Sequence, residues 1–170
     1  MRRRRFAATV VASALAAGAG LFGACTADEA GEASGIGDVL AGARPAVAPF
    51  VGLGEARIAV GGRCRRVAIA DADDERARGL MELTDLAPYD GMLFAWEGDT
   101  DSAFTMFQTD LTLDIAWYDS AGRPVDSARM VPCPERDLAK CPRYRSSGRY
   151  RYALEGAGGS LDAGALGACG

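Results

Sequence analysis

The sequence RIAVGGRCRRVAIA, residues 57–70, is the stretch that decides the expected fold. Apolar and polar side chains alternate in Arg57–Val60 and Arg65–Ala70, and the pair Gly61 and Gly62 lies between these two runs. Alternation with a period of two is typical of a strand, and two glycines between such runs indicate a tight turn. The stretch therefore predicts a β-hairpin.

Further short runs of the same kind follow along the chain, separated by residues that are typical of turns. They are Gly91–Trp96, Ala103–Phe107, Leu113–Asp119, Arg123–Val131 and Tyr150–Glu155. Many short strands with closely spaced turns favour an antiparallel sandwich or barrel. We therefore expect a mainly β, compact, jelly-roll-like domain.

Helical periodicity is clearest in DDERARGLM, residues 73–81. Ala77, Leu80 and Met81 are spaced i, i+3 and i+4, which places them on one face of a helix. Asp71 or Asp73 is expected to cap this helix, because short polar side chains satisfy free backbone N–H groups at a helix start. The sequence predicts one short helix near residues 72–82, and residues 157–165 are a second candidate helix.

Asp114 is unusual because it lies inside an apolar run, between Leu113 and Ile115. A buried carboxylate costs several kcal/mol unless a cation or backbone donors pair with it. We expect Arg76 or Arg78 to reach Asp114 and so to fix the helix to the sheet. Two alternatives remain open: a helix whose charges are simply solvated, and a ligand site built from the same groups.

The start of the chain is typical of an export signal. Four arginines precede an apolar run from Phe6 to Ala24, and small residues precede Cys25. The stretch before Cys25 resembles the lipobox of bacterial lipoproteins, which implies cleavage after residue 24 and a diacylglycerol on the cysteine. Ordinary secretion, an uncleaved membrane helix and twin-arginine export are the alternatives. We expect a signal peptide over residues 1–24, a lipidated N-terminus with a flexible tether over 25–55, and a single β domain over 56–170.

Charge further limits the partners. Removing four of the 19 basic residues with the signal leaves 15 against 23 acidic residues, a net charge of −8. Such a surface disfavours nucleic acid. We expect a monomer that is held at the extracytoplasmic face of the cell membrane by acyl chains on Cys25.

With Cys25 assigned to lipid, four cysteines remain, and an even number in an exported chain favours disulfides. Three pairings are possible. We favour Cys133–Cys141, because the polar loop between them is flanked by prolines, which leaves Cys64–Cys169. A four-thiolate zinc site is disfavoured, since closely spaced cysteine pairs are lacking.

The chemistry available to the chain is narrow. It contains no histidine, which excludes histidine triads and histidine-ligated metals, and we expect no metal and no cofactor. A glycosidase needs two carboxyl groups about 5 to 10 Å apart. The candidates are Glu75, Asp101, Asp110 and Asp114. Trp96, Phe104, Trp117 and Tyr118 could stack on a sugar, but aromatic residues in strands more often fill a core.

A resemblance to a known family runs from about Val67 to Glu155. The chain is similar to domain of unknown function 192, a family of bacteria and archaea. The matching motifs are Glu75-Arg76, Gly79-Leu80-Met81, Gly91-Met92-Leu93-Phe94 and Leu113-Asp114-Ile115. The segment Thr105-Met106-Phe107-Gln108-Thr109 departs from the family pattern, which has an aromatic residue at the first of these positions and a lysine at the third.

The resemblance implies a mainly β fold with the helix packed at one end, and it implies no agreed activity. We expect a binding or accessory module for a small envelope ligand or a glycan. The candidate ligand-binding residues are Glu75, Arg76, Arg78, Met106, Gln108 and Asp114. A carboxylate-dependent hydrolase acting on envelope glycans and a scaffold of an envelope complex are the alternatives.

Overall fold

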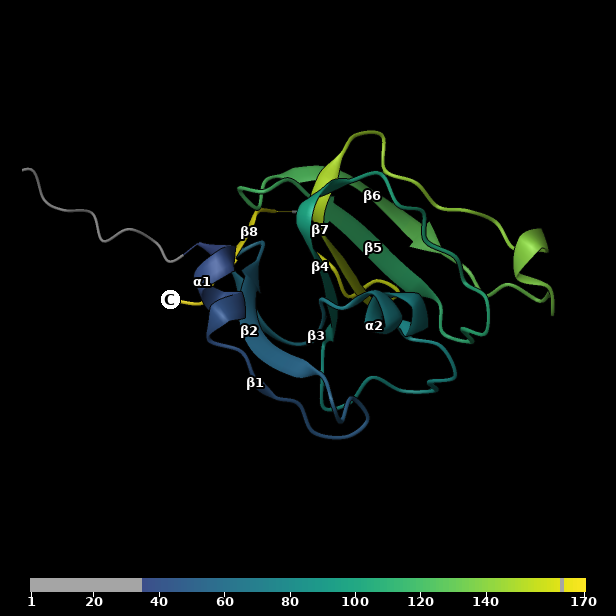
Figure 1. Ribbon diagram of the computed structural model, residues 1–170, viewed down its shortest axis with the longest axis horizontal. Helices are drawn as coiled ribbons and strands as arrows, with labels where there is room; N and C mark the ends of the chain where they lie inside the picture. The colour runs from purple at the N-terminus through teal and green to yellow at the C-terminus, as the bar shows by residue number, and fades with distance from the viewer. Residues whose placement is uncertain (1–34, 163) are drawn as a thin grey trace, which may run out of the picture. The chain divides into compact units, whose positions relative to one another are not determined.

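The computed structural model describes residues 35–162 and 164–170. The predicted signal peptide and Cys25 lie outside the described residues. The elements are α1 (Ile36–Ala41), β1 (Arg44–Pro45), β2 (Gly54–Val60), β3 (Arg63–Ala70), α2 (Asp73–Arg78), β4 (Gly91–Thr100), β5 (Leu113–Tyr118), β6 (Pro124–Met130), the 3₁₀ turn η1 (Leu138–Lys140), β7 (Tyr150–Ala157) and β8 (Leu166–Ala168) (Figure 1). Neither α-helix of the described residues is long and apolar enough to cross a membrane.

The predicted hairpin is confirmed as β2 and β3. Their antiparallel register pairs Val60 with Arg63 across a two-residue turn. Gly61 and Gly62 both have positive φ, 56° and 80°. Turns with two positive φ angles match the right-handed twist of the flanking strands, and glycine adopts them without steric cost.

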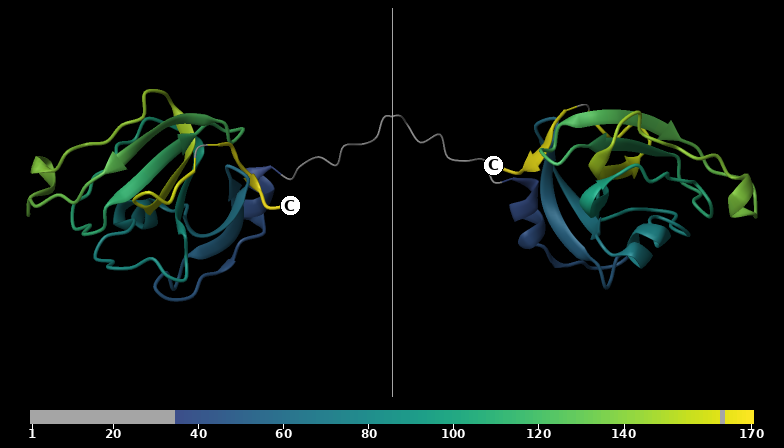
Figure 2. Two further views of the ribbon diagram at one scale, coloured as in Figure 1. Left: turned by 180° about the vertical axis from the view of Figure 1, so that it is seen from behind. Right: turned by 45° about the horizontal axis from the view of Figure 1, so that its top comes forward.

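All eight strands form one sheet, which confirms the mainly β class. The order is β1-β2-β3-β4-β7-β5-β6, and β8 pairs with β2. The sheet does not close into a barrel, and its path ends at β1 and β6 (Figure 2). The pairing of β3 with β4 is parallel. Parallel neighbours need a crossover between them, which is supplied here by residues 71–90, including α2.

Two predicted elements differ from the structure. The run Ala103–Phe107 is not a strand and contributes only the isolated bridge between Phe104 and Tyr144. The candidate helix near residues 157–165 is wrong for the described residues. There β7 ends at Ala157, and a turn follows in which Gly159 has a φ of 84°. Glycine-rich segments with positive φ do not continue a helix.

The folded body begins earlier than the predicted boundary at residue 56. Helix α1 contacts β2 and β8, and Ile36 and Phe50 are each only 5% exposed. The alanine- and glycine-rich composition of this segment suggested a tether. Burial of two large apolar side chains instead holds residues 35–54 against the sheet.

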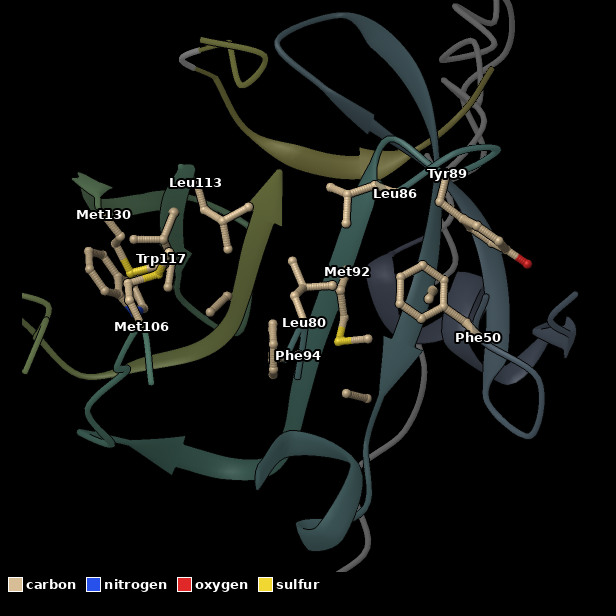
Figure 3. Packing of buried hydrophobic residues seen from close by; sticks show 14 of the residues in the cluster. Phe50, Leu80, Leu86, Tyr89, Met92, Phe94, Met106, Leu113, Trp117 and Met130 are labelled. Carbon is tan, nitrogen blue, oxygen red and sulfur yellow. The ribbon is translucent and has the colours of Figure 1, made fainter. Parts of the chain in front are cut away.

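Two hydrophobic clusters lie on the two faces of the sheet. Along β4, Met92 and Phe94 belong to the first cluster and Leu93 and Ala95 to the second. This alternation shows that β4 is buried on both faces, which explains its continuous apolar run. Figure 3 shows the first cluster, in which Leu80 of the crossover packs beside Met92 and Phe94.

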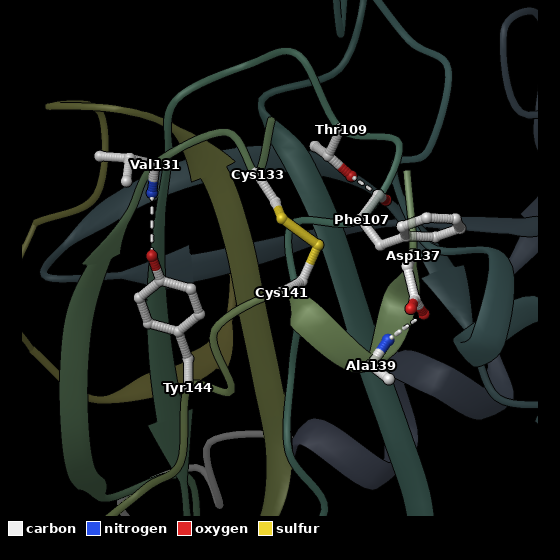
Figure 4. Close-up of a disulfide and its surroundings, with 8 residues drawn as sticks. All are labelled: Phe107, Thr109, Val131, Cys133, Asp137, Ala139, Cys141 and Tyr144. Carbon is white, nitrogen blue, oxygen red and sulfur yellow. Dashed lines mark hydrogen bonds between the residues drawn. A yellow bond between two sulfur atoms is a disulfide. The ribbon is translucent and has the colours of Figure 1, made fainter. Parts of the chain in front are cut away.

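Both predicted disulfides are present. Cys64 at the start of β3 is bonded to Cys169, and Cys133 is bonded to Cys141. Their Cα–Cα distances are 5.5 and 5.7 Å, within the usual range for disulfides. Figure 4 shows that the second bond closes the loop that contains Asp137 and Ala139, whose hydrogen bond begins η1.

Gly91 begins β4 and lies opposite Gly156 of β7. A Cβ at this position would lie 2.0 Å from the carbonyl oxygen of Glu155. Gly91→Ala is therefore expected to force these strands apart and to lower the free energy of unfolding by about 3 kcal/mol or more. The matched control is Gly98→Ala in the same strand, because a Cβ there meets no heavy atom within 4 Å. Equal urea midpoints for the two variants would contradict the argument.

Candidate functional site

Glu75 caps the start of helix α2, and Arg76 fixes the helix to the sheet. One carboxylate oxygen of Glu75 accepts hydrogen bonds from the backbone N–H groups of Asp71 and Ala72, each at 3.0 Å. The expected cap by Asp71 or Asp73 is wrong, because Ala72 is the N-cap residue and Glu75 reaches back to its N–H. Arg76 donates a hydrogen bond of 2.7 Å to the carbonyl of Ala95 in β4.

The chain leaves α2 at a sharp turn. Gly79 has a φ of 51° and lies against the ring of Phe94, so that Leu80 enters the core at 2% exposure. A residue with a β-carbon is rarely found in this backbone region. The turn places the segment after α2 over one face of the sheet, with a cavity between them.

This cavity is the candidate site and has a volume of about 380 Å³. Its wall comes from α2 and the following turn, from β4, and from the segment between β4 and β5. Glu155 of β7 is also part of its lining. The lining residues used below are Asp73, Arg76, Ala77, Arg78, Phe94, Trp96, Phe104, Met106, Arg143 and Glu155.

Glu155 is the unusual group in this cavity. It is 5% exposed, and its strand neighbours are Met92 in β4 and Ile115 in β5, which are both buried in the first hydrophobic cluster. No group in residues 35–162 or 164–170 hydrogen-bonds to its carboxyl or forms an ion pair with it. Burial raises the pKa of Glu155 to about 8, because the apolar surroundings disfavour the charged form.

A second buried carboxylate, that of Glu55, has hydrogen-bond partners within the same fold and serves as a comparison. It is 7% exposed, and its Oε2 accepts hydrogen bonds from the Tyr89 hydroxyl at 2.6 Å and from Arg66 Nε at 3.1 Å. These bonds lower the pKa of Glu55. Buried polar groups are normally paired in this way. Glu155 therefore needs a different explanation.

Aromatic rings line the cavity beside Glu155. The rings of Phe94 and Phe104 meet edge to face at 5.1 Å, and Trp96 lies 6.2 Å from Phe104. Trp117 and Tyr150 pack behind them, and both are fully buried. The expectation of a core role is thus confirmed for Trp117. Trp96 and Phe104 are partly exposed, and they line the cavity.

Apart from Glu155, the charged groups of the lining lie on α2 and on the segment after the second disulfide. Asp73 is paired with Arg76, whose Nη2 lies 2.5 Å from the carboxylate. Arg78 lies only within 3.9 Å of Glu82, and its side chain is 74% exposed. Arg143 is exposed and has no ion-pair partner in the part of the chain that the structure describes. Within the same part, no three potential metal ligands lie together.

The predicted pairing of Asp114 with Arg76 or Arg78 is wrong. Asp114 accepts a hydrogen bond of 2.8 Å from Nε of Arg129 on β6, and one of 2.5 Å from the backbone N–H of Gly159. Arg129 lies directly opposite Asp114 in the antiparallel register. Cross-strand neighbours are closer than a helix on another layer, which is why this arginine is the partner.

The ion pair of Asp114 with Arg129 supports the sheet edge, and its effect is testable. Hydrogen bonding to Arg129 lowers the pKa of Asp114. Asp114→Asn and Arg129→Gln, made singly and together, are expected to show a coupling of about 1 kcal/mol in urea unfolding, since the arginine is half exposed. The same cycle with Arg76→Gln in place of Arg129→Gln is the control and is expected to be additive.

The six predicted ligand-binding residues divide into two groups. Arg76, Arg78 and Met106 line the cavity, and Met106 does so from a buried position at 1% exposure. Glu75, Gln108 and Asp114 do not line it. Gln108 is exposed with a φ of 52°, and its carbonyl accepts a hydrogen bond from the N–H of Glu82.

The four acids proposed for hydrolysis do not come together. Glu75 lines a neighbouring pocket, Asp114 lines a third, and neither Asp101 nor Asp110 lines any of these. Sequence reasoning missed Glu155, which ends the predicted strand Tyr150–Glu155 and was given no functional role. A signal was available, because Ala153, Leu154 and Gly156 make the end of β7 apolar or small on both faces, as in a central strand.

The comparisons with known proteins agree with this fold. Residues 56–168 match the family model DUF192, described as "Uncharacterized ACR". A crystal structure of a protein of unknown function from Novosphingobium aromaticivorans DSM 12444 is similar, with a TM-score of 0.60 and 27% identity, over 72% of this chain and 91% of that chain. No curated protein matches the sequence.

A second similar crystal structure comes from Sinorhizobium meliloti 1021 and is described as a candidate transcription regulator. It shows 26% identity and a TM-score of 0.53, over 65% of this chain and 88% of that chain. The family model covers well over half of the chain and includes both Gly91 and Glu155. This chain therefore belongs to the DUF192 family of uncharacterised proteins.

Proposed function

We propose that this protein is a lipid-anchored binding module at the extracytoplasmic face of the cell membrane, and that it takes a small envelope molecule or a glycan into the cavity beside Glu155. The observation that carries the proposal is the carboxyl of Glu155, which borders the cavity on a residue that is 5% exposed and has no hydrogen-bond or ion-pair partner among the described residues. An unpaired buried polar group costs free energy. A ligand that hydrogen-bonds to Glu155 would recover part of that cost.

The cavity has the composition of a small-molecule site. Such sites are concave, lined mainly by apolar and aromatic side chains, and contain a few polar groups that orient the ligand. Phe94, Trp96 and Phe104 supply the aromatic surface, and Glu155 supplies the orienting group. Binding is favoured over hydrolysis because Glu155 is the buried carboxyl of this lining, and Asp73 at the rim is paired with Arg76.

The location rests on the N-terminal sequence and on the cysteines. The arginine-rich start, the apolar run and the small residues before Cys25 are typical of an exported lipoprotein. Disulfides form and persist in oxidising compartments, so the bonds Cys64–Cys169 and Cys133–Cys141 support export.

Lipidation is tested by labelling cells with an alkyne analogue of palmitate. We expect the label on the wild-type protein, in the membrane fraction. Cys25→Ser is expected to lose the label and to leave the membrane. A Cys25→Ser variant that retains the label would contradict the assignment of the anchor.

Binding in the cavity is tested by NMR on the full chain with Cys25→Ser, screened against chito-oligosaccharides and a collection of small ring compounds. We expect a ligand to shift the indole N–H signal of Trp96. Ala77→Trp places a bulky side chain at the exposed rim and is expected to abolish the shift, because Ala77 lines the cavity. Ala121→Trp, in an exposed turn outside the cavity, is the matched control. The proposal fails if no compound shifts Trp96, or if Ala77→Trp binds as well as the control.

A further inference from the structure

We propose that the ligand is a small amphipathic anion, with a hydroxyl or carbonyl group at Glu155, a flat apolar body along the aromatic wall, and a negative charge at the mouth. This inference rests on the proposed function and names the ligand class of the same cavity. Three separate observations in the cavity carry it.

The first observation is the state of the group deep in the cavity. Glu155 lies among Met92, Ile115 and Leu113, where a neutral carboxyl is favoured over a carboxylate. A neutral carboxyl both donates and accepts a hydrogen bond. A ligand hydroxyl or carbonyl satisfies it, whereas a second anion at this depth would be repelled once Glu155 ionises.

The second observation is the shape of the wall. Phe94 and Trp96 lie nearly parallel, with an interplanar angle of 23°, and Phe104 meets both edge to face. Trp96 and Phe104 are partly exposed and leave faces and edges for a further ring, and Phe94, at 1% exposure, supports them from behind. A planar apolar body therefore fits this part of the cavity better than a branched polar one.

The third observation is the charge at the mouth. Four charged side chains from other elements line the same cavity as Glu155: Asp73, Arg76 and Arg78 of α2, and Arg143 of the segment after the second disulfide. Asp73 pairs with Arg76, and Arg78 lies 3.9 Å from Glu82, so Arg143 is the cation of this lining that has no ion-pair partner among the described residues. Fields of one sign at a cleft raise the local concentration of the opposite charge. An anion is favoured here and an ammonium group is disfavoured.

Four matched naphthalenes test the proposal, titrated into the full chain with Cys25→Ser and followed by the Trp96 NMR signal. The probe that has all three features is 6-(hydroxymethyl)-2-naphthoate. Its matched controls are 6-methyl-2-naphthoate, which lacks the hydroxyl, 2-naphthalenemethanol, which lacks the charge, and 6-(hydroxymethyl)-2-naphthylmethylamine, whose charge is reversed. The first is expected to bind about tenfold more tightly than each single-feature control, with the amine the weakest.

Two variants separate the features. Arg143→Gln is expected to weaken the binding of 6-(hydroxymethyl)-2-naphthoate by about threefold to tenfold and to leave the affinity for 2-naphthalenemethanol unchanged. Between about pH 8 and about pH 9, wild-type affinity for 2-acetylnaphthalene, whose carbonyl can only accept a hydrogen bond, is expected to fall several-fold as Glu155 loses the proton that it donates, while Glu155→Gln shows a flat profile.

The outcomes distinguish this inference from the proposed function. If the amine or the uncharged alcohol binds as tightly as the acid, the anionic class is wrong, although the cavity still binds ligands. If none of the four binds while another compound shifts Trp96, the class is likewise wrong. A pH profile that is the same in the wild type and in Glu155→Gln would overturn the role of Glu155.

Discussion

Replacing Glu155 by glutamine is expected to leave stability at about pH 4.5 nearly unchanged and to raise it by roughly 5 kcal/mol above about pH 8. In the folded protein the pKa of Glu155 is raised from 4.5 to about 8 by burial. Between these values the folded state holds a proton that the unfolded state has released. The wild type therefore loses stability as pH rises through this window, and the glutamine variant does not share that loss.

Urea unfolding of the wild type and Glu155→Gln across this pH range measures the difference. The two curves are expected to diverge steadily and then to run parallel above the folded-state pKa. Arg151, the neighbour of Tyr150 and Tyr152 on β7, offers a control, since Arg151→Gln changes an exposed ion pair with Asp99 and leaves the burial of Glu155 unchanged. A difference in stability between the wild type and Glu155→Gln that does not change with pH would contradict the prediction. It would show that water or another group stabilises the charged carboxylate of Glu155.

Removing the bond between Cys64 and Cys169 is expected to cost about 4.7 kcal/mol of unfolding free energy. The two cysteines are 105 residues apart, so the bond restricts nearly the whole unfolded domain. Cys64 is exposed and Cys169 partly exposed, and serine at both positions removes little packing. The loss of stability therefore arises mainly because the unfolded chain gains conformational entropy when the bond is removed.

The second disulfide provides the comparison. Cys133→Ser with Cys141→Ser opens a loop with a separation of 8 residues, for which the same relation gives about 2.5 kcal/mol. Cys141 is 5% exposed, so some lost packing adds to this figure. Urea midpoints of the two double variants and of the wild type show directly which disulfide stabilises the protein more. A larger loss for the short loop would mean that local packing, and not chain restriction, determines the stabilisation.

Periodicity predicted the strands well because it reports burial along a single element. The alternation around Gly61 and Gly62 fixed both strands of the hairpin. The spacing of Ala77, Leu80 and Met81 indicated a helix in this region, but α2 ends at Arg78, so Leu80 and Met81 follow it in the turn, and Ala77 is exposed. Periodicity does not show which distant elements lie next to one another. The parallel pairing of β3 and β4, and the pairing of Asp114 with Arg129, depend on strand order, which a periodic pattern does not contain.

The candidate site was predicted in part for the same reason. Arg76 and Arg78 were found because charges beside an apolar anchor are conspicuous in a sequence. Glu155 was missed because an alternating strand with an acid is normally read as half exposed, whereas β7 is a central strand that pairs with β4 and β5 at its edges and has a hydrophobic cluster on each face. The apolar and small residues around Glu155 indicate a central strand, and the sheet order shows that the acid is buried.

The crossover between β3 and β4 has a consequence for how such a domain diversifies. Residues 71–90 join two parallel strands and at the same time supply much of the wall of the cavity. Their exposed positions, such as Ala77 and Arg78, can be exchanged without changing any strand pairing. Relatives that share the sheet can thus acquire different preferences through this one connecting segment, while the carboxyl beneath it stays in place.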